Sequence, residues 1–248
     1  GDLRAAVLTP FIGYTIRGVF WDQGESGTMT RAVDQLAMMS ALITSWRADW
    51  GQGDFPWVFV PKPSGGGCAF DPADPVFGWA SEPFAPLPDA VPTKPPGREV
   101  YLQLAKLPNT QMVPSSDLGA GLHPANKFAY GTRALNVILN RVYGRDVPAS
   151  GPVLRDTEVK EGKIIVRFKE TTGGLVTRHG SGLQGFAIAG EDKKFVWAEA
   201  VIEGDEVIVS SPSVPQPRYV RYAWADAIQW ANLFNGAGLP ATPFRTDE

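Results

Sequence analysis

The order of apolar segments over the first sixty residues constrains the fold most strongly. Residues 16–21 form a short apolar stretch between turn residues, which predicts a buried strand. Over about residues 30–50, apolar side chains recur at helical spacing, and Gly51 stands where a helix commonly ends. Residues 55–61 predict a second buried strand. A strand, a helix and a strand in this order make a βαβ unit, which favours a parallel sheet.

The same α/β alternation continues to about residue 143. Residues 62–97 are rich in Pro, Gly, Ser and Ala and predict a long irregular segment, which in compact domains is usually functional or mobile. A helix is expected near residues 98–107, a strand near 111–115 and a further helix over about 125–143. A short helix is also expected at residues 3–12.

The pattern changes after Pro148. Short strands are expected at residues 163–168, 185–189, 207–209 and 219–223, separated by turn pairs such as Gly173-Gly174. Such spacing is typical of an antiparallel sandwich or jelly-roll-like module. We therefore expect an α/β domain over residues 1–147 and a small antiparallel β-sandwich over residues 148–248.

Composition excludes several classes of partner. Hydrophobic residues make up 44% of the 248 residues and charged residues 20%, close to the average for globular proteins. A formal net charge of −3 gives no electrostatic reason to expect nucleic acid or an anionic membrane as a partner. No stretch approaches the roughly 20 apolar residues of a membrane-spanning helix, and no signal peptide is visible. Cys68 is the only cysteine, so no intrachain disulfide forms.

No cofactor or metal is expected from the motifs. A metal site needs several convergent His, Cys or carboxylate ligands, and the sequence shows no such cluster. No glycine pattern follows a strand at the spacing of a phosphate-binding loop.

Two polar loops follow predicted strands, at residues 22–28 and 117–127. In parallel α/β folds, chemistry collects beyond the carboxyl ends of the strands. The first loop offers the Gln23 amide, the Gly24 backbone and the Glu25 carboxylate, which suit oxyanion binding and imidazole orientation in acyl transfer. The second loop carries His123 before Pro124, a pair that by itself equally fits a structural histidine that caps or packs.

Together these loops resemble a known family. Residues 20–26, Phe-Trp-Asp-Gln-Gly-Glu-Ser, are similar to the Trp-x-Gln-Gly-Glu-Ser block of sialate O-acetylesterases in the SGNH (GDSL-like) hydrolase superfamily. Residues 122–127, Leu-His-Pro-Ala-Asn-Lys, resemble that family's catalytic His-Pro-x-Asn-Lys block. Further segments that resemble the family lie at residues 46–53, 107–110 and 238–245, so the resemblance covers most of the chain except residues 62–97.

The resemblance implies a carbohydrate esterase that hydrolyses O-acetyl esters on sugars, nominally sialic acid, on a partial SGNH-type three-layer α/β/α domain. His123 matches the general base of a serine-histidine mechanism, and Gln23 and the Gly24 amide match the oxyanion-stabilising positions. Asn126 and Lys127 match neighbours that anchor the following helix. An acetylated sugar as partner and a secreted or periplasmic location follow from the same resemblance.

The sequence departs from the family at the residue that orients the histidine. Family members often carry an aspartate two residues before the histidine, and Gly121 occupies that position here. Some relatives use the glutamate of the first loop, which would make Glu25 the orienting acid, and Asp117 is a second candidate. Geometry rather than sequence order defines such a triad, so both alternatives stay open.

The second departure concerns the nucleophile. The family's catalytic serine lies in a Gly-x-Ser block upstream of the first loop, and residues 1–248 hold no convincing counterpart, since Ser26, Ser64, Ser115 and Ser116 lie in other contexts. We therefore expect an upstream segment or a separate chain to supply the serine. The alternatives are a non-catalytic carbohydrate-binding or interaction protein on a degenerate hydrolase scaffold, and an active esterase with an unrecognised nucleophile such as Ser26.

Two other features are assigned to structure rather than chemistry. His179 is expected in a surface turn of the β module. Four tryptophans offer faces for a sugar platform, although core packing is the commoner use of such side chains: Trp21, Trp197, Trp224 and Trp230.

Overall fold

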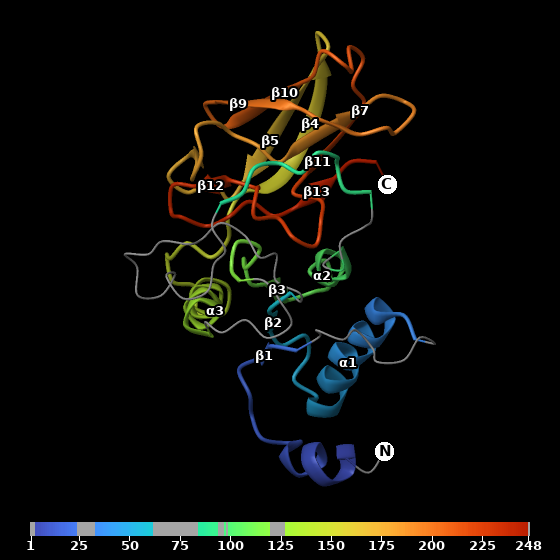
Figure 1. Cartoon of the computed structure of the whole chain (residues 1–248). Coiled ribbons are helices and arrows are strands. Elements are labelled where there is room, and N and C mark those ends of the chain that lie inside the picture. The colour runs from blue at the N-terminus through green and yellow to red at the C-terminus, as the bar shows by residue number, and fades with distance from the viewer. Residues whose placement is uncertain are drawn as a thin grey trace.

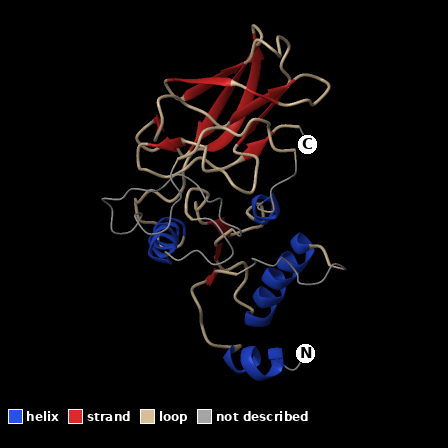
Figure 2. Ribbon diagram, in the orientation of Figure 1, coloured by secondary structure: helices blue, strands red, loops and turns tan. Residues whose placement is uncertain are grey.

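The computed structural model describes residues 3–23, 33–61, 84–93, 97, 99–119 and 127–247. A small parallel sheet with helices occupies the first part of the chain, and antiparallel sheets follow it (Figures 1 and 2). The expected mixed α/β class is therefore confirmed. Among the described helices, none has the length and apolar character needed to cross a bilayer.

The parallel sheet contains three strands in the order β1-β2-β3. These are β1 (Val19–Trp21), β2 (Trp57–Phe59) and β3 (Thr110–Met112). Strand β2 pairs in parallel with both neighbours, with Val58 opposite Phe20 on one side and Gln111 on the other. The predicted βαβ unit is thus present, and β3 extends it by one strand.

Strand β2 is the centre of this part because both of its faces are buried. Trp57 and Phe59 pack against α1 (Gln35–Trp50) and α2 (Glu99–Leu104), whereas Val58 and the following Val60 pack against α3 (Lys127–Arg141). Alternate residues of a strand point to opposite faces, so one continuous apolar run serves two cores. Helices therefore cover both faces of the sheet.

Strand β1 differs from the buried strand that the sequence predicted. It contains three residues instead of six, and the Phe20 side chain is 47% exposed. The reason is its position at the end of the sheet, where among the described residues only β2 lies beside it. An apolar run does not reveal whether a strand is central or at an edge.

Helix α1 begins later than the periodicity predicted. The Asp34 carboxylate caps it by accepting a hydrogen bond of 2.8 Å from the backbone N–H of Ala37. Gly51 ends it, as expected, with a φ of 63° and an N–H that donates to the Arg47 carbonyl. Upstream, the helix expected at residues 3–12 is instead two short exposed elements, η1 (Arg4–Leu8) and η2 (Thr9–Phe11).

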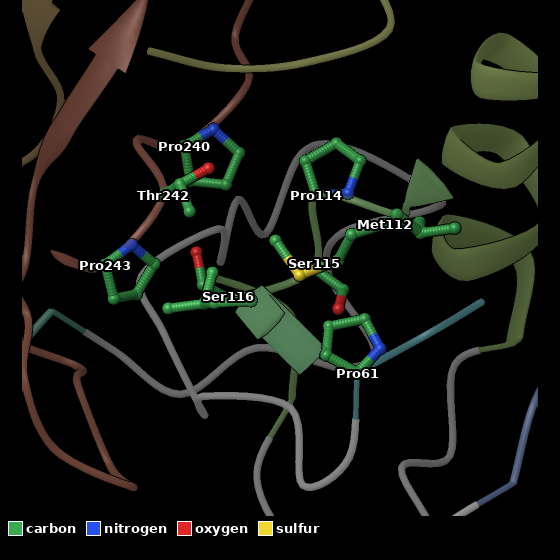
Figure 3. Close-up of a pocket in the computed structure, with 10 residues that line it drawn as sticks. Pro61, Met112, Pro114, Ser115, Ser116, Pro240, Thr242 and Pro243 are labelled. Atoms are coloured by element: carbon green, nitrogen blue, oxygen red, sulfur yellow. The ribbon is translucent and has the colours of Figure 1, made fainter. Parts of the chain in front are cut away.

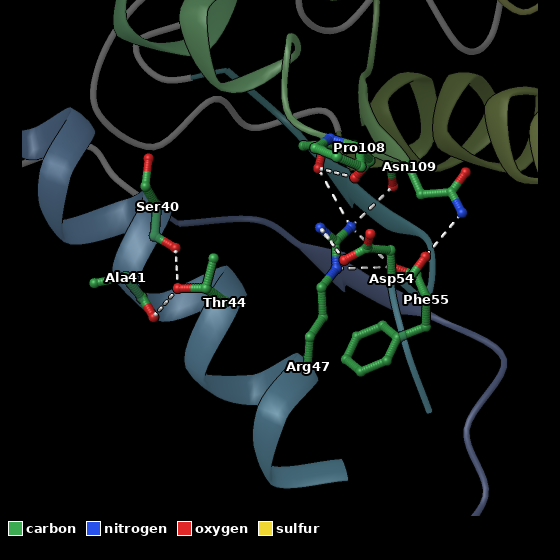
Figure 4. Close-up of polar contacts among 9 residues, drawn as sticks. Ser40, Ala41, Thr44, Arg47, Asp54, Phe55, Pro108 and Asn109 are labelled. Carbon is green, nitrogen blue, oxygen red and sulfur yellow. Dashed lines mark hydrogen bonds and ion pairs between the residues drawn. The ribbon is translucent and has the colours of Figure 1, made fainter. Parts of the chain in front are cut away.

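Arg47 ties α1 to the turns that enter β2 and β3 (Figure 4). Its side chain is 7% exposed, and its Nε and Nη2 atoms donate to the Phe55 carbonyl at 3.2 and 2.9 Å. The Nη2 atom also donates to the Asn109 carbonyl at 3.3 Å. Burial lowers the pKa of Arg47, against the opposing effect of Asp54. One guanidinium therefore satisfies carbonyls from two turns far apart in the sequence.

The second part of the chain forms two four-stranded antiparallel sheets and a two-stranded ribbon. Hydrophobic side chains from both four-stranded sheets share one core, including Val166 and Val207 from one and Ile188 and Val220 from the other. The first sheet contains β4 (Val153–Lys160), β5 (Lys163–Lys169), β10 (Glu206–Ser210) and β9 (Glu199–Glu203). The second contains β13 (Phe244–Arg245), β11 (Tyr219–Tyr222), β7 (Phe186–Ala189) and β8 (Val196–Trp197), and the ribbon pairs β12 (Leu233–Asn235) with β6 (Leu175–Thr177).

The four strands predicted in this β module correspond to β5, β7, β10 and β11, and the remaining six were missed. Strand β4 shows why, because six of its eight residues are exposed and its sequence has little apolar character. It is held by antiparallel pairing with β5 across its length. The domain boundary at residues 147/148 stays a prediction.

Residues 84–93 lie along the β module, although the sequence placed them in an excursion of the α/β part (Figure 1). The Ala85 N–H donates to the Gln229 carbonyl at 3.1 Å, and the Gln184 amide donates to the Ala85 carbonyl at 3.0 Å. The Trp197 indole N–H donates to the Pro88 carbonyl at 2.7 Å. These hydrogen bonds attach the segment to the β module through residues far apart in the sequence.

All four tryptophans considered for a sugar platform pack in or against a hydrophobic core. Trp21 contacts the rings of Trp46 and Trp57, with centroids 6.3 and 5.8 Å apart. Trp224 and Trp230 are 5% and 4% exposed, and Trp197 packs edge-on against Trp230.

We expect Arg47→Met to destabilise the fold by about 2 to 3 kcal/mol, because the buried Phe55 carbonyl loses both of its guanidinium hydrogen bonds. Urea denaturation measures this free energy of unfolding. The matched control is Arg4→Met, which removes an exposed ion pair to Asp49 and should cost less than about 1 kcal/mol. Equal losses in the two variants would contradict the role assigned to Arg47.

Asp247 makes the stability of the fold depend on pH. Burial alone would raise the pKa of this carboxyl, but hydrogen bonds from Arg221 at 2.9 and 2.5 Å lower it below its usual value. A carboxyl with a lowered pKa in the folded state stabilises the fold above its unfolded pKa of about 4, and this contribution is lost as the pH falls. Urea titrations from about pH 6 to pH 2 should therefore show a shallower pH dependence in Asp247→Asn than in the wild type. Superimposable curves would rule this contribution out.

Candidate functional site

The candidate site lies where the three parallel strands end. Asp22 and Gln23 follow β1, Val60 and Pro61 follow β2, and residues 113–119 follow β3. Because parallel strands end at the same edge of a sheet, both predicted polar loops start from this edge.

An ion pair links the two loops. The Lys127 ammonium lies 3.7 Å from a carboxylate oxygen of Asp22, and it also lies 5.6 Å from the centre of the Tyr130 ring. Asp22 immediately precedes Gln23, and Lys127 begins α3 four residues after His123. The start of one loop and the end of the other are therefore neighbours in space.

Of the predicted catalytic residues, Gln23 is the one that the structure describes. It is an exposed residue directly beyond the end of β1. Gly24, Glu25 and His123 lie outside the described residues, as do Gly121 and Asn126. Their roles as oxyanion donor, orienting acid and general base remain predictions.

Asp117 lies inside the protein and is engaged by Arg133. The two side chains are 3% and 4% exposed, and both guanidinium nitrogens Nη1 and Nη2 bond to the carboxylate, the latter at 2.6 Å. Arg133 also donates to the Pro114 carbonyl at 2.6 Å. This bidentate pair accounts for the burial of Asp117 without an imidazole partner. It favours a structural role for Asp117, which anchors the start of the His123 loop to α3.

Sequence reasoning missed Arg133. The available signal was its helical spacing from apolar residues that line the buried face of α3, namely Ala129, Tyr130, Ala134 and Val137. An arginine on such a face needs a buried acid, and Asp117 is the acid that the fold provides.

Ser115 and Ser116 line a small cavity between the sheet edge and the β module (Figure 3). The cavity has a volume of about 20 Å³, and prolines form much of its wall. Ser115 is 1% exposed, and within the described structure its hydroxyl has no hydrogen-bond partner. The described residues that line the cavity include no histidine and no carboxylate.

His179 lies in a bend of the β module, with a φ of 63°. Its ring lies 6.1 Å from that of Phe84, and its carbonyl accepts a hydrogen bond of 3.0 Å from the Asn232 amide. The His179 side chain is thus half-buried and packs against Phe84, whereas the sequence predicted a residue of a surface turn. Across the described ranges, no group of three or more His, Cys, Asp or Glu side chains is arranged to hold a metal ion.

We expect Asp117→Asn to destabilise the fold by about 3 to 5 kcal/mol, because it leaves the buried Arg133 charge uncompensated. The control is Asp156→Asn, which removes an exposed acid that Arg155 and Arg167 contact and should cost much less stability than Asp117→Asn. Thermal and urea denaturation measure both. An Asp117→Asn protein as stable as the wild type would refute the anchoring role.

Comparison with known proteins gives an informative likeness to a solved structure. No protein-family model matches the chain, and no curated protein matches it either. Among solved structures, the crystal structure of a carbohydrate acetylesterase from Xanthomonas citri superimposes with a TM-score of 0.74 and 32% sequence identity. The match covers 97% of this chain and 52% of that one, so the chain spans about half the length of this neighbour. Over nearly its whole length, the chain therefore shares the fold of one half of a carbohydrate acetylesterase.

Proposed function

We propose that this chain is the base-bearing and oxyanion-bearing portion of a carbohydrate esterase that hydrolyses O-acetyl esters on sugars. The observation that carries the proposal is the likeness, over 97% of the chain, to a carbohydrate acetylesterase. The Asp22–Lys127 ion pair supports it, because it brings together the two loops that hold the predicted site residues. Sialic acid esters are the substrates that the motif resemblance favours, and residues 1–147 would form part of an SGNH-type α/β/α domain.

In the proposed mechanism, a serine hydroxyl attacks the acetyl carbonyl while His123 accepts its proton. The Gln23 amide and the Gly24 N–H stabilise the negative charge on the carbonyl oxygen, and Glu25 orients the imidazole. His123 then protonates the departing sugar oxygen, which leaves as a free hydroxyl, and water hydrolyses the acetyl-serine. The position of Gln23 beyond the carboxyl end of β1 suits this task.

The nucleophile is proposed to come from outside residues 1–248, on the same polypeptide or on a separate chain. Support comes from the two described serines at this edge, Ser115 and Ser116, because the described residues that line their cavity include no base. The proposal includes an acetylated sugar as partner and a secreted or periplasmic location, both by resemblance.

We expect a serine-bearing segment, once supplied, to create activity on 4-nitrophenyl acetate and on O-acetylated sialic acid. In that complex His123→Ala should lower kcat by about 10⁴ to 10⁶, and Gln23→Ala by about 10² to 10³. His179→Ala is the control and should leave kcat unchanged, since His179 packs in the β module. Activity that survives His123→Ala would refute the proposal.

A second candidate is a non-catalytic carbohydrate-binding protein, which Gly121 favours because it replaces the acid that many relatives carry. Binding of an O-acetylated sugar without turnover, even with the serine segment present, would establish it. A fluorophosphonate probe applied to the chain alone tests the remaining alternative, because labelling would reveal an activated serine such as Ser26.

A further inference from the structure

A cleft lies between β3 and the β module. It has a volume of about 410 Å³, within the range of roughly 300 to 1,000 Å³ in which small-molecule sites are usually found. One wall comes from β3 and from the ends of α2 and α3, and the other comes from residues of the β module such as Val153 and Lys169. Along β3 the described lining stops at Met112, and it includes none of the residues that follow β1 and β2. The cleft is therefore a separate feature from the sheet edge that carries Gln23.

The charged side chains of this cleft are mostly cationic. Lys106, Arg141 and Lys169 line it, and Glu170 is the acid among its described lining residues. Arg141 pairs with Glu170 at 2.5 Å, so one positive charge is compensated. Across the described ranges, neither lysine ammonium has an ion-pair partner. Two uncompensated positive charges therefore remain in the lining.

The helix ends at the cleft do not account for both lysines. Lys106 follows α2, a helix of six residues, and a cation there complements the partial negative charge of the last helix carbonyls. Lys169 ends strand β5, which carries no comparable charge because strands have only small net dipoles. Each helix end contributes at most about half a negative charge, so α2 and α3 together offset about one of the two positive charges. The cleft therefore keeps an excess positive charge and favours an anion.

The uncharged part of the lining suits a sugar. Gln111 is half-buried, and its side-chain amide has no hydrogen-bond partner within the described structure. The Ser150 hydroxyl donates to the Gly151 carbonyl, so its oxygen is still available as an acceptor. Leu102 and Val153 add apolar surface. A few polar groups on an apolar wall are the usual composition of a small-molecule site, and a sugar offers both hydroxyl and C–H groups to it.

We propose that this cleft binds a sugar unit that carries a carboxylate, with the carboxylate on the Lys106 and Lys169 ammonium groups and a sugar hydroxyl on the Gln111 amide. The choice of a sugar rests on the proposed function, whereas the preference for an anion rests on the cleft itself. An esterase with such a site holds an acidic polysaccharide at a second point, apart from Gln23. It therefore favours acetylated chains that contain uronic acids over neutral acetylated chains.

Isothermal titration calorimetry on the full 248-residue chain tests this site without the catalytic serine. We expect tetragalacturonate to bind with a Kd below about 1 mM, and the neutral xylotetraose to bind about tenfold more weakly or worse. Tetraglutamate, which carries its carboxylates on a peptide, and inorganic phosphate should also bind about tenfold more weakly, because neither offers the sugar hydroxyls. Raising the salt concentration from about 50 to about 500 mM should weaken tetragalacturonate binding, since salt screens exposed charges.

Lys106→Gln and Lys169→Gln each remove one positive charge from the lining. We expect each to weaken tetragalacturonate binding by about threefold or more, and the double variant by about tenfold or more. Lys163→Gln is the matched control, because Lys163 is exposed at the other end of the same strand, β5, and does not line the cleft. Both cleft lysines are exposed, so the melting temperature of each variant should match that of the wild type.

The outcomes separate the cleft from the enzymatic proposal. Tetragalacturonate binding that the cleft substitutions weaken supports the site, even where a complex with the serine segment hydrolyses no ester and the esterase function falls. Ester hydrolysis by such a complex, in the absence of tetragalacturonate binding, overturns the site and keeps the function. Equal affinity for xylotetraose overturns the role of the carboxylate, and equal affinity for tetraglutamate or phosphate overturns the role of the sugar. Equal weakening by Lys163→Gln overturns the assignment to this cleft.

Discussion

The burial of β2 on both faces is the constraint on which the α/β part depends. Four successive residues, from Trp57 to Val60, are each at most 2% exposed, and they alternate between the α1/α2 core and the α3 core. A strand buried in this way needs a helix layer on each face and a paired strand at each edge. The parallel order that results sends the segments after β1, β2 and β3 to one edge, where the candidate site lies.

Two ion pairs hold the segments around the His123 loop, and they act differently. The buried Asp117–Arg133 pair fixes the start of the loop to α3, and loss of one partner would leave an uncompensated charge in the core. The Asp22–Lys127 pair, at 3.7 Å and partly exposed, adds little stability. Its effect is on position, because it holds Asp22, directly after β1, beside the first residue of α3.

The β module is attached to the same helices that cover the sheet. Arg141 at the end of α3 pairs with Glu170 at 2.5 Å, and Arg245 of β13 pairs with Glu99 of α2 at 2.9 Å. Residues 84–93 add hydrogen bonds from the long connecting segment. These links hold the module next to β3, whereas β1 lies at the other end of the described sheet.

Local periodicity in the sequence determined the positions of α1, β2 and α3 and the parallel order of β1 and β2, because each depends on residues close together in the chain. It also singled out Gln23 and the loops after β1 and β3. Only the tertiary structure decided that Phe20 is at an edge, that Asp117 pairs with Arg133 and that residues 84–93 cover the β module. Each of these depends on partners distant in sequence, or on the absence of one among the described strands, and a one-dimensional pattern carries no information about such neighbours.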